Sequence, residues 1–210
     1  LGSSLVHIHL GEGLHNLVYT GDFNFERSRL FDPAFTKFQR VETLLMESTY
    51  GGGEDCIQPK REEAEEKLKK IIRETLQNGG KILIPSFAVG RAQEVMCILA
   101  DMEDLEYPVY LEGMLWDATA IHTTYPEYLN KNLQRKILHE KDNPFTSPIF
   151  KRIGSTQERK EVIESTQPCI VIATSGMLVG GPAIEYLKAF AEDPRNALIF
   201  VGYQAEGTLG

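Results

Sequence analysis

The sequence has 210 residues, of which 42% are hydrophobic and 25% are charged. These fractions are typical of a globular protein and exclude a disordered chain. The 22 basic and 30 acidic side chains give a net charge of 22 − 30 = −8, so nucleic acid cannot be bound through bulk positive charge and would need a local site or help from outside this chain. No apolar run reaches the ~20 residues that cross a bilayer, and we expect no membrane partner.

The three cysteines, Cys56, Cys97 and Cys169, lie far apart and form no CxxC pair. This spacing excludes a disulfide framework and an all-cysteine zinc knuckle, and it fits a reducing, cytoplasmic location. The sequence opens without an initiator Met and without the charged-then-apolar leader of a signal peptide. We therefore expect a fragment of a longer protein.

The residues before position 47 predict three strands. Residues 5–10 alternate apolar and polar side chains, residues 11–13 supply the glycines of a turn, and residues 17–20 return as the hairpin partner. A third strand is expected over residues 42–46.

From residue 60 onward, helical and strand patterns alternate. The clearest helix covers 60–77 and ends at Gly79-Gly80. Its expected apolar face consists of Ala64, Leu68, Ile71, Thr75 and Leu76. Strands are expected at 81–85, 108–112, 169–173 and 197–201, helices at 90–102, 117–130, 156–166 and 182–192, and a Pro-interrupted connection at 142–150. This order predicts an α/β fold with a mostly parallel sheet and helices on its faces, and the fully apolar strands agree with it.

Glycine and polar side chains follow five of the expected strands. The segments are 47–52, 86–91, 112–114, 174–177 and 202–207. The carboxyl ends of parallel strands meet at one edge, where open α/β sheets bind ligands, and helix N-termini at that edge favour anions such as phosphate. Each segment alone is also explained by turns and helix caps. All five together predict a binding site without specifying its chemistry.

Several familiar signatures are absent from the sequence. No GxGxxG follows a strand, and there is no GxxxxGK[ST] or GxSxG, which argues against a dinucleotide oxidoreductase, an NTPase and an α/β-hydrolase. The histidines form neither HExxH nor HxHxDH. His7 and His9 share one strand face, but zinc needs three or four donors, so we expect them, like His122 and His139, to be surface residues. Asp22 follows a strand end, where it is either a metal-facing carboxylate or a turn former.

Five segments occur in the order found in one protein family. They are Tyr19-Thr20-Gly21-Asp22-Phe23, Met46-Glu47-Ser48-Thr49-Tyr50-Gly51, Pro85-Ser86-Phe87-Ala88-Val89-Gly90-Arg91-Ala92-Gln93-Glu94, Ala173-Thr174-Ser175-Gly176-Met177 and Gly202-Tyr203-Gln204-Ala205-Glu206-Gly207-Thr208-Leu209. In this series the sequence resembles the β-CASP branch of the metallo-β-lactamase superfamily, and in particular the archaeal homologues of the nuclease subunit of the cleavage and polyadenylation specificity factor. The resemblance covers essentially the whole chain, and five segments in register are highly specific.

The resemblance implies an architecture and a set of site residues. Residues 1–48 would be the later part of a metallo-β-lactamase αββα domain, residues 49–198 a Rossmann-like β-CASP domain, and residues 199–210 the return into the first domain. Asp22 would be the catalytic aspartate that bridges two zinc ions, and Glu47 the catalytic-site glutamate that pairs with a later histidine near the scissile phosphate. The wall of the RNA cleft would include Ser86, Arg91, Ser175, Gly176 and Met177.

The resemblance further implies that the parent protein is a zinc-dependent ribonuclease. It would act on single-stranded RNA in 3′-end processing or decay, as an endonuclease, an exonuclease or both, and would form a homodimer with KH-type RNA-binding domains upstream. The family's metal-binding histidines would lie outside these 210 residues, so we expect the chain alone to bind no zinc stably and to be inactive. Two alternatives stay open: a non-catalytic β-CASP scaffold for RNA or partner subunits, and an unrelated Rossmann-like binder of small molecules.

Overall fold

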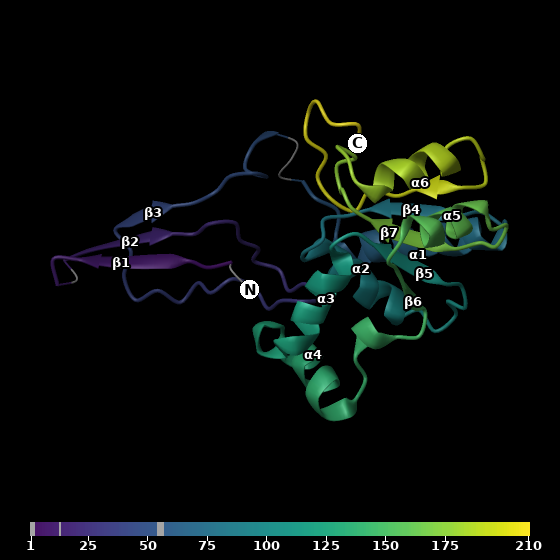
Figure 1. Cartoon of the computed structure of the whole chain (residues 1–210). Coiled ribbons are helices and arrows are strands. Elements are labelled where there is room, and N and C mark those ends of the chain that lie inside the picture. The colour runs from purple at the N-terminus through teal and green to yellow at the C-terminus, as the bar shows by residue number, and fades with distance from the viewer. Residues whose placement is uncertain (1–2, 13, 54–56) are drawn as a thin grey trace.

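The computed structural model describes residues 3–12, 14–53 and 57–210 and contains a small and a large sheet (Figure 1). The small sheet has the order β1-β2-β3, with β1 (Val6–Leu10), β2 (His15–Tyr19) and β3 (Thr43–Leu45). β1 is antiparallel to β2, and β2 is parallel to β3. The three expected strands are confirmed, with ends that differ by one or two residues. Gly13, in the expected turn, and Cys56 lie outside the described residues.

The large sheet has five parallel strands in the order β6-β5-β7-β4-β8. These strands are β4 (Ile82–Pro85), β5 (Val109–Glu112), β6 (Phe150–Ile153), β7 (Ile170–Ala173) and β8 (Ala197–Leu198). The expected strand over 197–201 is too long, because only its first two residues pair with β4. The expected connection over 142–150 is also wrong at its end, where β6 begins. β6 has two exposed polar residues, Lys151 and Arg152, between two buried ones, as an edge strand allows.

Six α-helices accompany the large sheet in the described residues. They are α1 (Arg61–Gln77), α2 (Arg91–Ala100), α3 (Leu115–Thr124), α4 (Lys131–Arg135), α5 (Thr156–Glu164) and α6 (Pro182–Phe190). The expected helix over 117–130 is wrong in extent. α3 ends before Pro126, which cannot continue an α-helix because it lacks an N–H, and Pro126 opens a short 3-10 turn, η2 (Pro126–Tyr128).

The helices pack on both faces of the large sheet. On one face, Ile82, Ile84 and Ile172 pack in a core with residues of α1, α2 and α3. On the other, Leu83 and Val171 pack with residues of α5 and α6. The strands are therefore buried on both sides, as their apolar sequences predict, and the expected α/β class is confirmed. In α1 the expected burial of Leu68, Thr75 and Leu76 is confirmed, whereas Ile71 is half-buried and Ala64 is exposed. Ile72 is buried instead, because it shares a face with Leu68 and Leu76 at a spacing of four. No described helix has the length and apolarity of a membrane span.

The connection from β2 to β3 is anchored in the large unit, which consists of the five-stranded sheet and the helices packed on it. The Leu30 side chain is 0% exposed and belongs to the core beneath α1 and α2. The Leu30 N–H donates to Glu94 Oε1 at 3.1 Å, and the Asn130 N–H donates to the Leu30 carbonyl at 2.7 Å. The neighbouring Arg29 donates to Glu65 Oε2 at 2.6 Å. These contacts hold the small sheet's connection against the large unit.

We predict that Leu30→Ala lowers the free energy of unfolding by about 2–5 kcal/mol, because it removes a fully buried side chain and leaves a cavity. Urea unfolding followed by circular dichroism measures this change. The matched control is Leu14→Ala, whose side chain is 77% exposed and whose loss changes stability by no more than ~0.5 kcal/mol. Equal stability of the two variants would contradict the claim that Leu30 anchors the connection from β2 to β3 in the core.

Candidate functional site

Parallel pairing brings the two predicted acidic residues to one edge of the small sheet. Tyr19 at the end of β2 pairs with Leu45 at the end of β3, and the Thr20 N–H continues the pairing by donating to the Leu45 carbonyl at 3.0 Å. Asp22 and Glu47 follow directly after these ends. The Glu47 N–H donates to Thr20 Oγ1 at 3.4 Å. The structure therefore places together two residues that lie far apart in the sequence.

Gly21 turns the chain so that Asp22 leaves the line of the strand. Its φ is +59°, a conformation that L side chains rarely adopt, and a Cβ there would lie 3.3 Å from the Ser4 carbonyl oxygen. Glycine adopts positive φ without steric penalty. The Asp22 side chain that follows is exposed, so its carboxylate is free to meet a ligand at this edge.

The Glu47 carboxylate is held by hydrogen bonds from the backbone. The Thr49 N–H donates to Glu47 Oε2 at 2.7 Å. This bond, with further donation from the Thr49 side chain and the Phe23 N–H, lowers the pKa of Glu47 below its ordinary value. The Phe23 contact also places the Glu47 carboxylate beside the residue that follows Asp22. Glu47 is thus an anion at neutral pH and accepts hydrogen bonds.

The described residues do not form a metal site by themselves. Nowhere in these residues do three or more His, Cys, Asp or Glu side chains converge in a metal-binding arrangement. His7 and His9 lie on one face as expected, with ring centroids 4.2 Å apart, and His9 Nδ1 lies 2.6 Å from the Asn16 side-chain oxygen. A zinc ion at Asp22 would therefore need further donors from outside the described residues.

The loops after β4 and β7 meet at the edge of the large sheet. The Ser86 N–H donates to the Ala173 carbonyl at 2.9 Å. A Cβ on Gly176 would lie 2.9 Å from the Phe87 nitrogen, so only glycine permits this approach. Gln204 Nε2 donates to the Gly176 carbonyl at 3.0 Å. α2 follows β4 on one face and α6 follows β7 on the other, an arrangement at which open α/β sheets bind ligands.

The predicted cleft residues differ in what they present at this edge. Ser86 is 1% exposed, and its hydroxyl donates to the Phe87 carbonyl at 3.3 Å. The Ser175 hydroxyl donates to the Gly180 carbonyl at 3.1 Å and accepts from the Val179 N–H at 2.9 Å, and Met177 is half-buried. Arg91, the first residue of α2, is exposed. Its guanidinium forms no ion pair with the part of the chain that the structure describes, so it is available to an anion.

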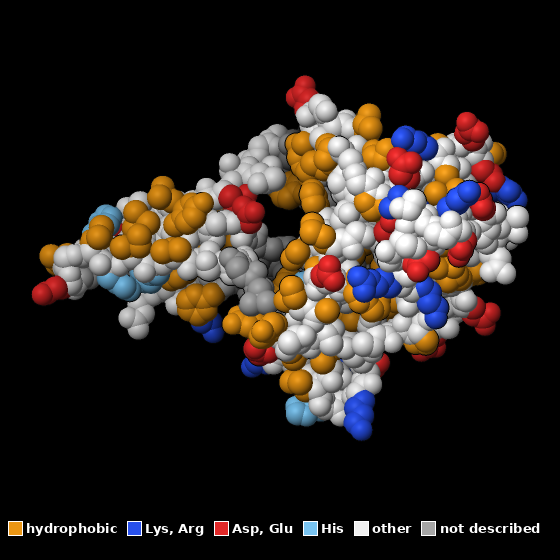
Figure 2. All heavy atoms as spheres, in the orientation of Figure 1, with side chains coloured by type: hydrophobic (Ala, Val, Ile, Leu, Met, Phe, Trp, Pro, Cys, Tyr) orange, Lys and Arg blue, Asp and Glu red, His pale blue; other side chains and the backbone are white. Residues whose placement is uncertain are grey.

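The two edges face each other in the structure. In Figure 1, β2 and β3 run toward the large unit, and α2 lies on the side of that unit nearer the small sheet. Figure 2 shows an open space between the small sheet and the large unit on this face. The strand ends that precede Asp22 and Glu47 thus point toward the large unit, to which the loops after β4 and β7 belong.

Other polar residues near the edge serve the fold. Glu112, in a predicted edge segment, is buried, forms an ion pair with Arg159 and accepts a hydrogen bond from the Tyr186 hydroxyl at 2.6 Å.

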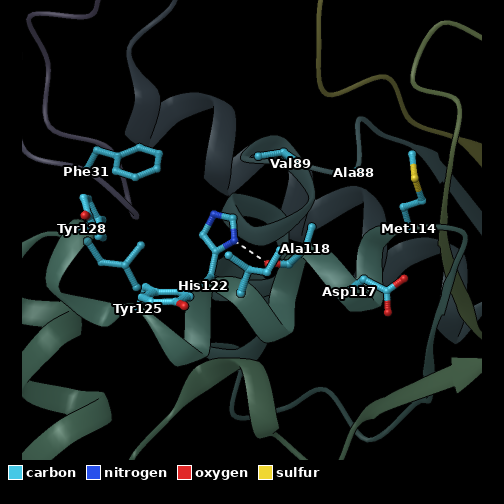
Figure 3. Close-up of a pocket in the computed structure, with 11 residues that line it drawn as sticks. Phe31, Ala88, Val89, Met114, Asp117, Ala118, His122, Tyr125 and Tyr128 are labelled. Carbon is cyan, nitrogen blue, oxygen red and sulfur yellow. Dashed lines mark hydrogen bonds between the residues drawn. The ribbon is translucent and has the colours of Figure 1, made fainter. Parts of the chain in front are cut away.

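The sequence did not predict a pocket of about 360 Å³ beside the loop after β4 (Figure 3). His122, expected at the surface, is half-buried there. His122 Nδ1 lies 2.7 Å from the carbonyl oxygen of Ala118, four residues earlier in α3.

Comparison with known proteins finds a matching family model and similar archaeal proteins. The Beta-Casp domain matches residues 92–210. The chain is 60% identical over 213 residues to the transcription termination factor FttA of Methanocaldococcus jannaschii, 59% identical to that of Thermococcus kodakarensis, and 52% identical over 214 residues to that of Lokiarchaeum sp.. In each case the match covers 100% of this chain and 33% of the relative. The chain therefore spans about a third of the length of these relatives, and the resemblance found in its motifs is confirmed.

We predict that Thr49→Val raises the pKa of Glu47 partway toward its ordinary value, because valine removes the side-chain donor and keeps the backbone one. Carbonyl-carbon NMR titration of the Glu47 side chain measures this. Since the folded pKa is the lower one, the ionised carboxylate stabilises the fold above the unfolded pKa, and that stability is lost as the pH falls through the folded value. An ordinary Glu47 pKa in the unsubstituted chain would contradict the backbone contacts.

Proposed function

The chain belongs to the β-CASP family, and on this premise we propose that its parent protein is a zinc-dependent ribonuclease that hydrolyses RNA phosphodiester bonds. The observation that carries the proposal is the parallel pairing of β2 with β3, which brings Asp22 and Glu47 to one edge. The name of the relatives, transcription termination factor, supports action on a transcript in 3′-end processing or decay. A cytoplasmic location is supported by Cys97 and Cys169, which are free and buried.

Asp22 would be the metal ligand that this chain contributes. Its exposed carboxylate, just past Gly21, is an oxygen donor of the kind zinc accepts, and the remaining donors would come from the rest of the parent. Two zinc ions, when bound, supply an activated water and neutralise charge on the phosphate. In this proposal the chain alone binds no zinc stably and is inactive.

Glu47 would act as a positioning residue for a general acid. A carboxylate that stays ionised at neutral pH accepts a hydrogen bond from an imidazole, and its charge favours the protonated ring. A histidine held in this way near the scissile phosphate can deliver a proton to the leaving oxygen, a contribution worth ~10²–10⁴-fold in rate. The backbone contacts from Thr49 and Phe23 fix the carboxylate in place for that role.

Arg91 and the backbone of the loops after β4 and β7 would position single-stranded RNA through its phosphates. Such contacts set the orientation of the strand more than they select its sequence. The net charge of −8 means that much of the affinity would come from elsewhere in the parent, including upstream KH-type domains and a second subunit of a homodimer. Ser86, Ser175, Gly176 and Met177 would shape this wall.

We predict different effects for substitution of the two acids in the full-length protein. Asp22→Asn lowers both zinc content and cleavage of single-stranded RNA, because it removes a ligand charge. Glu47→Gln lowers cleavage by ~10²–10⁴-fold and leaves zinc content unchanged, because the residue orients a proton donor. Cleavage of end-labelled RNA and elemental analysis of the purified protein measure the two effects.

Glu12→Gln, in the exposed turn after β1, is the matched control and keeps both properties. Wild-type cleavage by both the Asp22 and Glu47 variants would end the assignment. Full-length protein that binds RNA without cleaving it would instead support the non-catalytic scaffold.

A further inference from the structure

A pocket lies beside the loop after β4, between the anchored connection that contains Leu30, helix α3 and the η2 turn. Its cavity volume is about 360 Å³, within the range of sites for small molecules. In Figure 3, Phe31, Tyr125 and Tyr128 gather at one end, Asp117 lies at the other, and the His122 ring stands between them. These side chains come from segments far apart in the sequence and line one space.

The pocket exposes aromatic surface that the fold does not cover. Tyr125 is 47% exposed and Tyr128 is 55% exposed, and Phe31 is also exposed. Clustered exposed apolar side chains mark interaction sites more often than isolated ones do. Flat rings that are accessible on one face are suited to stacking against another flat ring, and a nucleobase of single-stranded nucleic acid offers such a ring whatever its sequence.

Two polar side chains of the pocket, His122 and Asp117, offer hydrogen-bond acceptors, and the hydroxyls of Tyr125 and Tyr128 can both donate and accept. His122 Nδ1 lies 2.7 Å from the Ala118 carbonyl oxygen. A carbonyl only accepts, so Nδ1 carries the proton and Nε2 of the neutral ring is an acceptor. Asp117 adds a carboxylate that has no cationic partner within the described chain. None of the described residues that line the pocket is a lysine or an arginine, so the pocket does not suit a phosphate. It suits an aromatic group that brings donors.

We propose that this pocket holds a nucleobase with an exocyclic amino group, splayed out of single-stranded RNA. Cytosine and adenine present an amino donor on the edge where uracil presents a carbonyl acceptor, and a carboxylate favours the former. Val89 of the pocket is separated from the exposed Arg91 by Gly90 alone, so a base in the pocket leaves its phosphate near a cation. The inference rests on the proposed RNA substrate, and it does not depend on cleavage.

The test uses the full-length protein with Asp22→Asn, without added metal, so that binding is measured without turnover. Fluorescence anisotropy with oligo(C) and oligo(U) of equal length gives the Kd at several salt concentrations. Wild-type pocket residues are expected to favour oligo(C). Replacing Tyr125 and Tyr128 by alanine is expected to weaken oligo(C) binding by about 10-fold, since stacking contributes ~1–3 kcal/mol per base. The salt dependence stays unchanged, because no phosphate contact is lost.

Two further variants keep the result interpretable. Replacing both tyrosines by phenylalanine keeps the rings and is expected to leave the Kd within about twofold. Asp117→Asn, at an exposed position, is expected to reduce the preference for oligo(C) over oligo(U). Unchanged affinity in the alanine variant, or equal losses in the alanine and phenylalanine variants, would overturn the proposal, and the pocket would then be assigned to a protein partner. If the full-length protein gives these binding results but does not cleave RNA, only the proposed nuclease activity is overturned.

Discussion

Parallel pairing of β2 with β3 is the constraint on which the candidate site depends. Two parallel strands cannot be joined by a tight turn and need a long crossover, and here the crossover leaves the small sheet altogether. It places Leu30 in the core of the large unit, where Glu94 and Asn130 bind its backbone, before it returns to β3. The connection that allows β2 and β3 to pair, and so brings Asp22 and Glu47 to one edge, therefore also fixes the small sheet to the large unit.

The large sheet contributes the second half of the arrangement. Its buried parallel strands end in loops that glycine allows to approach closely, as at Gly176 against Phe87. The serine hydroxyls of these loops are used within the loops themselves, and the exposed Arg91 guanidinium is available to a ligand. These two sets of groups agree with the proposal above, in which the large unit positions the phosphates of RNA and Asp22 and Glu47 of the small sheet take part in hydrolysis.

Much of the fold follows from local sequence patterns, and the site follows from them only in part. Fully apolar runs such as 170–173 predict buried parallel strands, whereas β6 escapes prediction because Lys151 and Arg152 break its apolar pattern at the sheet edge. Asp22 and Glu47 are found by their positions after strands, but their proximity depends on strand register, which the sequence does not state. The pocket around His122 is assembled by tertiary packing from three separate segments and leaves no periodic signal.

The most direct test is anomalous diffraction at the zinc absorption edge from crystals of the full-length protein. The account predicts a zinc peak at the Asp22 carboxylate, with the Glu47 side chain turned toward the same site from the neighbouring strand end. Zinc bound away from Asp22, or Asp22 and Glu47 turned to different sides of the small sheet, would contradict it.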